Sequence, residues 1–147
     1  MNPLVSRLTT PEECRVFIIN AGDKGRQDLV QEARIRCLQL KANHHLDISE
    51  VERECLMAVY AYEEVLAQKN GRKTRANRTW QVIKRYGVVA GIERLVCKQS
   101  DSSGFTVLSS LGLADYLFEN VVLRNADAFS DEAVISSKAR LASLGHG

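Results

Sequence analysis

The side chains in this sequence that are best suited to bind a ligand are cations, and they are concentrated in residues 69–98. This segment has nine lysine and arginine residues and one acid, Glu93, which gives it a net charge of +8. The rest of the chain has 11 basic and 17 acidic residues, a net charge of −6, so the overall charge of +2 hides the contrast. An uneven charge distribution of this kind indicates a charged partner. The segment therefore predicts a binding site for a polyanion.

The chemistry expected of this basic segment (residues 69–98) is phosphate binding. Arginine presents a planar set of donors that matches a phosphate group, and lysine presents a compact positive charge. Asparagine, threonine and the free backbone N–H groups at a helix start also bind phosphates. The charge is densest in residues 69–78, and residues 84 and 85 extend it. The predicted nucleic-acid-binding residues are Lys69, Arg72, Lys73, Arg75, Arg78, Lys84 and Arg85.

Arg94 and Lys98 are interpreted as isolated cations on a helix that mainly packs. Two helices that meet at Gly87 would have roughly the lengths of a helix-turn-helix, in which the second helix reads the major groove of DNA. However, Glu93 falls where that second helix needs a buried aliphatic residue, and only these two cations would reach the bases. Binding led by the phosphate backbone, with little sequence preference, fits the placement of charge better.

Three kinds of partner remain open for the basic segment. The leading hypothesis is a non-enzymatic helical protein that binds nucleic acid, DNA or RNA, mainly through the phosphate backbone. The alternative is a helical protein–protein interaction module, an adaptor or regulatory subunit, that uses the same basic face on an acidic protein surface. The acidic remainder of this chain could itself be that surface. A small phosphorylated ligand is the third kind.

No motif of a catalytic or metal site occurs in the sequence. Glu63 and Glu64 are adjacent, so they do not converge on one substrate, and Glu63 is expected to face solvent beside Tyr62. His44 and His45 are adjacent as well, without a third metal ligand or a nucleophile nearby. The glycines of the basic segment are isolated, so they form no glycine-rich phosphate loop. No catalytic residue, metal or cofactor is predicted, and a non-enzymatic protein is favoured, although catalytic residues can also assemble from distant positions.

The four cysteines, Cys14, Cys37, Cys55 and Cys97, lack the spacing of a zinc site or of a disulfide framework. Each falls on an apolar stripe of an expected helix, so four reduced thiols in the core are predicted. The chain also lacks the roughly 18 consecutive apolar residues of a membrane span and the apolar run of a signal peptide. A cytoplasmic location without membrane association is expected.

The spacing of apolar residues predicts helices, because no stretch shows the alternation of apolar and polar residues that is typical of a β-strand. Thr10 and Ser49 are each followed three residues later by a glutamate, the pattern of a capping box at a helix start. Trp80, the single tryptophan, is expected to pack in a seam between helices rather than to stack on bases. The expected helices cover about residues 10–21, 25–42, 49–69, 75–85, 88–98, 105–111 and 114–124, and a last helix follows Ser130.

These elements predict an all-α fold: a compact bundle of about six to eight helices, in which three longer N-terminal helices pack with shorter C-terminal ones. By its length the chain, residues 1–147, is a single domain, and the polar loop 99–104 is a candidate sub-boundary. The expected helix over residues 114–124 is apolar on most faces. That pattern predicts either a helix of the core or a contact in a homo-oligomer.

Overall fold

The computed structural model describes residues 1–98 and 103–145, and in these residues the protein is all-α. The predicted fold class, a compact all-α bundle, is confirmed. One single-turn helix, α1, was not predicted and brings the α-helices in the described ranges to nine. The elements are α1 (Pro3–Ser6), α2 (Pro11–Asp23), α3 (Gln27–Ala42), α4 (Glu50–Asn70), α5 (Asn77–Tyr86), α6 (Val88–Cys97), α7 (Ser103–Ser110), η1 (Ala114–Tyr116), α8 (Phe118–Arg124), η2 (Ala126–Ala128) and α9 (Asp131–Gly145).

The two predicted helix starts are observed, although the predicted capping box is complete only at Ser49. Thr10 Oγ1 accepts a hydrogen bond from the Glu13 N–H at 3.1 Å, and Pro11 occupies the first position of α2, where no N–H is needed. At the start of α4, the side chains of Ser49 and Glu52 accept hydrogen bonds from each other's backbone N–H groups, at 3.1 and 3.0 Å. These bonds satisfy N–H groups that a helix leaves without an internal partner, so they fix where α2 and α4 begin.

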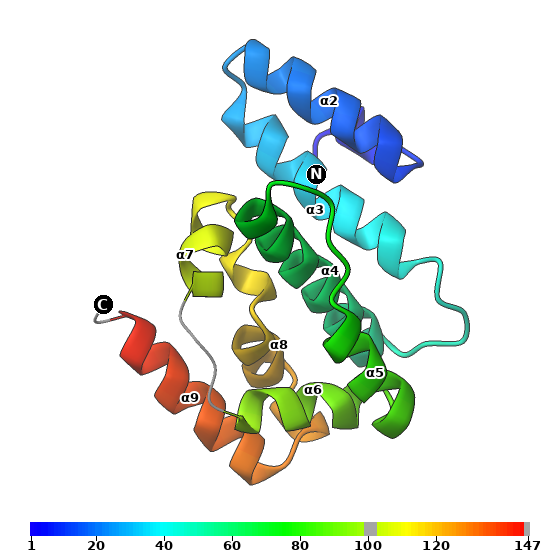
Figure 1. The fold of residues 1–147 in the computed structure, drawn as a ribbon. Coiled ribbons are helices and arrows are strands. Elements are labelled where there is room, and N and C mark those ends of the chain that lie inside the picture. Colours follow the sequence, from blue (N-terminus) through cyan, green and yellow to red (C-terminus); the bar gives the residue numbers. More distant parts are fainter. Residues whose placement is uncertain (99–102, 146–147) are drawn as a thin grey trace.

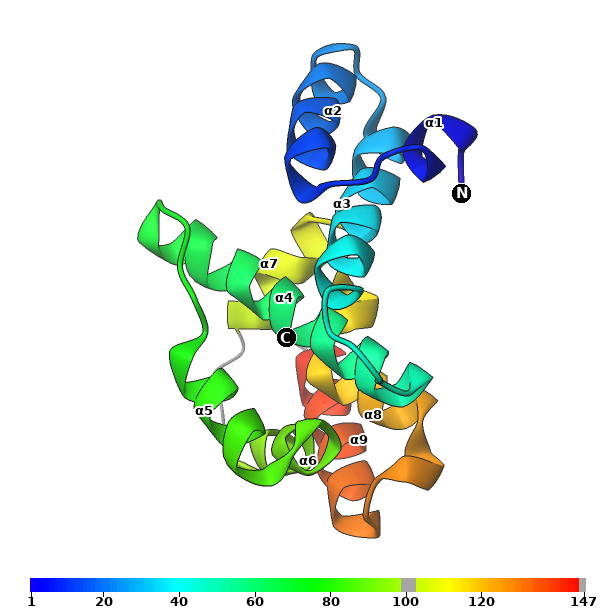
Figure 2. The ribbon, with the colours of Figure 1, turned by 90° about the vertical axis from the view of Figure 1, so that its right-hand side faces the viewer.

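The long helix α4 lies at the centre of the bundle (Figure 1). α3 packs against it from the N-terminal half of the chain, and α6, α7 and α8 pack against it from the C-terminal half. α2 packs against α3 and forms a hairpin with it, and Figure 2 shows α1 beside α3 at the same end of the molecule. α9 packs against α6 and α8. α4 therefore joins the N-terminal half, through α3, to the shorter C-terminal helices.

Two apolar clusters share α4. In the first, Val59 of α4 packs with Ile92 of α6 and Val121 of α8. In the second, Leu56 of α4 packs with Leu38 of α3. These five side chains are at most 1% exposed, and burying one such side chain stabilises a fold by about 1.5–3 kcal/mol. Because α4 contributes residues to both clusters, it buries apolar side chains on more than one face.

The segment predicted as one helix over residues 114–124 consists of two. η1 ends at Tyr116, Leu117 adopts a non-helical conformation (φ −58°, ψ 143°), and α8 follows. The break allows Leu117 to pack in the cluster around Leu56, whereas Val121 packs in the cluster around Val59. Val121 is fully buried, as a helix of the core requires.

Three of the four cysteines lie in the core. Cys14, Cys37 and Cys55 are buried, and burial raises the pKa of the Cys14 thiol to about 11 and that of the Cys55 thiol to about 12. The prediction of a core position is wrong for Cys97, which is exposed because it is the last residue of α6.

Two further predictions concern the chain as a whole. Within the described ranges, no helix combines the length and the apolar character needed to cross a membrane. The candidate sub-boundary at residues 99–104 falls largely outside the described residues, and Gly104 belongs to α7.

Candidate functional site

The basic segment begins at the end of α4 and the loop after it, and the rest folds into two helices joined at a single residue. α5 ends at Tyr86, α6 begins at Val88, and Gly87 between them has φ 91° and ψ 170°. A positive φ of this size favours glycine, since a side chain would clash with the backbone. The connection is shorter than the three- or four-residue turn of a helix-turn-helix, so α5 and α6 do not have that geometry.

Gly91 allows α6 to pack tightly against α5. A Cβ atom at this position would lie 3.1 Å from both the Cα and the Cγ1 of Ile83, closer than ordinary van der Waals contact. Arg94 follows Gly91 by three residues and therefore lies on the same face of α6. The close contact of the two helices thus brings a cation of α6 next to those of α5.

Glu93, the single acid of the basic segment, points to another part of the molecule. Its carboxylate accepts a hydrogen bond from the Ser130 N–H at 2.7 Å, directly before α9. Neighbouring positions of a helix point in different directions, so Glu93 can contact α9 while Arg94 faces α5. The charge on the α5 side of α6 is therefore not neutralised by this acid.

A groove of about 550 Å³ lies along α5 and α6, and we call it the basic groove. Four cations line it: Arg78 and Arg85 of α5, Arg94 of α6, and Lys98 just after α6. None of the residues lining it in the described part of the chain is acidic. None of the four cations forms an ion pair with a carboxylate of residues 1–98 or 103–145. The neutral lining residues are Tyr62, Thr79, Gln81, Val82, Tyr86 and Leu95.

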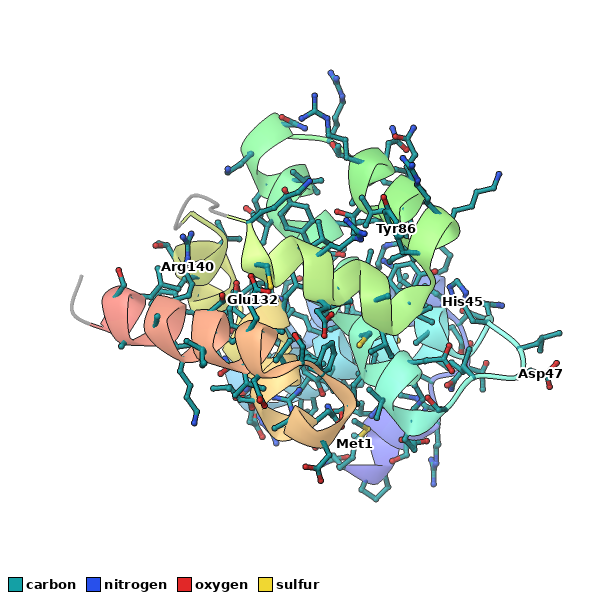
Figure 3. The ribbon with its side chains drawn as sticks, turned by 90° about the horizontal axis from the view of Figure 1, so that it is seen from below. Met1, His45, Asp47, Tyr86, Glu132 and Arg140 are labelled. Atoms are coloured by element: carbon teal, nitrogen blue, oxygen red, sulfur yellow. The ribbon has the colours of Figure 1, made fainter. Side chains whose placement is uncertain are left out.

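Tyr86 positions two of these cations. The Arg94 guanidinium lies 3.7 Å from the centroid of the Tyr86 ring, and the Arg85 guanidinium lies 5.2 Å from it. A cation–π contact at an exposed site contributes about 0.5–1 kcal/mol, enough to favour one side-chain position over others. Figure 3 shows Tyr86 on α5 with nitrogen-tipped side chains around it. One ring therefore holds guanidinium groups from two helices close together.

Arg94 and Lys98 are functional candidates that the sequence analysis missed. The interpretation of these two residues as isolated is wrong, because both line the same groove as Arg78 and Arg85. They are distant along the chain, but the turn at Gly87 allows α6 to pack against α5. The signal available in the sequence was a glycine flanked by two helices that both carry cations.

The other predicted cations lie outside the basic groove. Lys73 and Arg75 line a separate cavity of about 150 Å³ between α2, α3, α4 and the loop after α4. Glu63 and Glu64 also line this cavity, so its charge is mixed. The three remaining residues are exposed and line neither cavity: Lys69, Arg72 and Lys84.

Glu63 anchors the start of α5. Its Oε2 accepts hydrogen bonds from the backbone N–H of Ala76 and from the indole N–H of Trp80, both at 2.8 Å. Arg75 Nε lies 3.3 Å from the same oxygen. The prediction that Glu63 faces solvent is wrong: the residue is 9% exposed, because the loop after α4 folds back along α4 and covers it. Glu63 thereby holds one wall of the basic groove in place.

Trp80 packs against both apolar clusters, in agreement with the expected seam between helices. Its indole stacks on the His45 ring, with centroids 5.8 Å apart and planes 12° apart. His45 Nε2 and the Tyr60 hydroxyl are joined by a hydrogen bond of 2.8 Å. Burial, then the neighbouring charges of His44 and Arg75, lower the pKa of His45 below its usual value of 6.5.

This stacking predicts a pH-dependent tryptophan signal. We expect Trp80 fluorescence to fall on acidification, with a midpoint below pH 6.5, because an imidazolium ring stacked on an indole quenches it. The unfolded chain binds more protons at this site than the folded one between the two pKa values. The contribution of His45 to the free energy of unfolding therefore decreases as the pH falls below about 6.5 and levels off below the folded pKa.

A fluorescence titration of the parent and two variants measures this effect. His45→Gln should abolish the transition. His44→Gln replaces the adjacent histidine and should keep the transition. A midpoint above pH 6.5, or an unchanged transition in His45→Gln, would contradict the assignment.

No group of three or more histidine, cysteine, aspartate or glutamate side chains in the described part of the chain could hold a metal ion. Comparisons with protein-family models, with curated proteins and with solved structures give no match to this chain. A functional proposal therefore rests on the charge and geometry of the described residues.

Proposed function

We propose that this protein binds nucleic acid, DNA or RNA, mainly through the phosphate backbone, and that the basic groove is the binding site. The observation that supports this most directly is the arrangement at Tyr86. Arg85 and Arg94 contact one ring from two helices, and Arg78 and Lys98 line the same groove. No acid of the described residues lines the groove or pairs with these cations.

Electrostatics favours an anionic ligand in such a groove. Like charges held close together repel one another, and a bound anion converts that repulsion into attraction. Arginine donors match the oxygens of a phosphate group in pairs, and three of the four cations are arginines. Because the Tyr86 ring already restricts two guanidinium groups, binding requires less loss of side-chain freedom.

The first test is the dependence of binding on salt. If all four cations contact phosphates, the logarithm of the binding constant should fall with the logarithm of salt concentration with a slope of roughly −3.6 for duplex DNA. For a single strand the corresponding slope is roughly −2.8. Fluorescence anisotropy of a labelled oligonucleotide between 50 and 200 mM salt measures both.

Polyglutamate serves as the control polyanion in this measurement, since it carries carboxylates in place of phosphates. It should compete weakly with the oligonucleotide. The absence of salt-sensitive binding to any nucleic acid would refute the proposal. Equal competition by polyglutamate would instead favour the alternative use of the groove, an acidic protein surface.

A further inference from the structure

A second cavity, of about 170 Å³, adjoins the basic groove. The two cavities share three lining residues, Tyr62 of α4, Thr79 of α5 and Leu95 of α6. They are therefore neighbouring parts of one depression, with cations along one part and a different lining in the other.

Aromatic and aliphatic side chains dominate the second cavity, which we call the aromatic pocket. Tyr62, Phe105 of α7 and Phe118 of α8 contribute rings, and the rings of Tyr62 and Phe118 are 5.9 Å apart at an angle of 54°. The charged residues in its lining are Glu119 and Arg140. A concave apolar pocket with a few polar groups is the usual form of a site for a small organic group.

Thr79 stands in the wall that separates the two cavities. It is 5% exposed and lines both of them. Its hydroxyl forms no hydrogen bond with any other residue in the described ranges. The hydroxyl oxygen is nevertheless not completely shielded from solvent. The hydroxyl of a residue that lines a cavity can donate a hydrogen bond to, or accept one from, a bound ligand that reaches it.

We infer that the aromatic pocket receives an unpaired base while the basic groove holds the phosphates beside it, so that the ligand is single-stranded nucleic acid. This inference rests on the proposed phosphate-binding function. A base contributes a flat apolar face for the aromatic and leucine side chains, and polar edges for Thr79, Glu119 or Arg140. A cationic groove that follows the backbone, next to rings that stack on bases, is the combination that single-strand binding requires.

A duplex does not satisfy this geometry, because its bases are stacked and paired inside the helix. It could contact the basic groove through its phosphates, but it would leave the aromatic pocket empty. Removing a base from a duplex requires a few kcal/mol of unpairing and unstacking, which a single strand does not need. The protein therefore prefers single strands at equal phosphate content.

The test compares three labelled probes at one salt concentration: a 24-nucleotide oligo(dT), an abasic oligomer with the same number of phosphates, and a twelve-base-pair duplex, whose two strands together carry almost the same number. One stacked base should make oligo(dT) bind roughly five- to 150-fold more tightly than the abasic oligomer. The duplex should bind no more tightly than the abasic oligomer does.

Phe105→Leu tests the pocket itself, because leucine keeps an apolar side chain but removes the ring. This variant should lower the affinity for oligo(dT) toward that of the abasic oligomer and leave the abasic affinity unchanged. Phe17→Leu is the matched control, since Phe17 of α2 packs against a separate apolar cluster formed by α1, α2 and α3. It should change neither affinity.

The outcomes separate the two proposals. Equal binding of oligo(dT) and the abasic oligomer, or tighter binding of the duplex than of oligo(dT), would contradict base binding in the aromatic pocket. Either result would still be consistent with phosphate binding in the basic groove. Loss of salt-sensitive binding to all three probes would overturn both. The comparison of probes uses the parent protein, so the result does not depend on whether a variant folds.

Discussion

Replacing Arg78, Arg85 and Arg94 together by glutamine is expected to weaken nucleic-acid binding by roughly a thousandfold. A hydrogen bond to a charged group contributes about 1.5–3 kcal/mol, and about 1.4 kcal/mol corresponds to a tenfold change in affinity. Three lost contacts at the low end of that range give the expected factor. All three side chains are exposed, so the variant should fold, and binding is measured by anisotropy at low salt.

A matched variant separates the basic groove from net charge. Arg7, Lys24 and Lys138 are exposed cations outside the groove, and replacing them by glutamine removes the same charge. We expect less than about a threefold loss of affinity from this change. Equal losses in the two triple variants would mean that overall charge, and not the groove, determines binding.

The predicted cations that lie outside the groove provide a second comparison. If nucleic acid binds along the whole basic segment, as the sequence predicts, the double replacement of Arg72 and Lys84 by glutamine should weaken binding strongly. If it follows the basic groove, the effect should be close to that of the charge control. Arg75 is left out of these variants because its pairing with Glu63 couples it to the fold.

Glu63→Ala is expected to lower the free energy of unfolding by about 3 kcal/mol. The substitution removes the acceptor of the Ala76 N–H and of the Trp80 indole N–H. A buried donor left without a partner costs about 1–3 kcal/mol, and two donors lose theirs here. Urea denaturation followed by circular dichroism measures the change.

Glu64→Ala and Glu63→Gln are the controls for this result. Glu64 is half-buried and lies 3.7 Å from Lys41 Nζ, an ion pair expected to contribute less than about 1 kcal/mol. Glutamine at position 63 can place its carbonyl oxygen where Oε2 now accepts both hydrogen bonds, so it should be milder than alanine. If Glu63→Ala destabilises no more than Glu64→Ala, the buried carboxylate does not anchor α5.

Local signals in the sequence were sufficient to predict most of the helices, although α1 was missed. The capping interactions at Thr10 and Ser49 involve residues within four positions of each other. Apolar residues on one helix face recur at about every turn. Both patterns can therefore be recognised without knowledge of the tertiary fold. The one predicted helix that proved to be two, residues 114–124, breaks at Leu117 because that side chain and Val121 belong to different clusters. That reason is tertiary and leaves no local pattern.

The candidate site was predicted only in part, for the same reason. Arg78 and Arg85 were found from charge density along the chain, which is a local property. Arg94 joins them through the turn at Gly87 and the tight contact at Gly91, and both depend on how two helices pack. The burial of Glu63 depends on donors 13 and 17 residues away, which no spacing rule in the sequence indicates.

Cys97 gives the molecule a built-in attachment point for a reporter group. It is the exposed one among four cysteines, all in the described residues, and the next residue, Lys98, lines the basic groove. The other three thiols are buried, so a maleimide dye would react at one place without any engineered substitution. Cys97 follows Glu93 by about one turn and therefore lies on the α9 side of α6, beside Ser136. The label would sit near the groove but outside it, where it would not block a ligand.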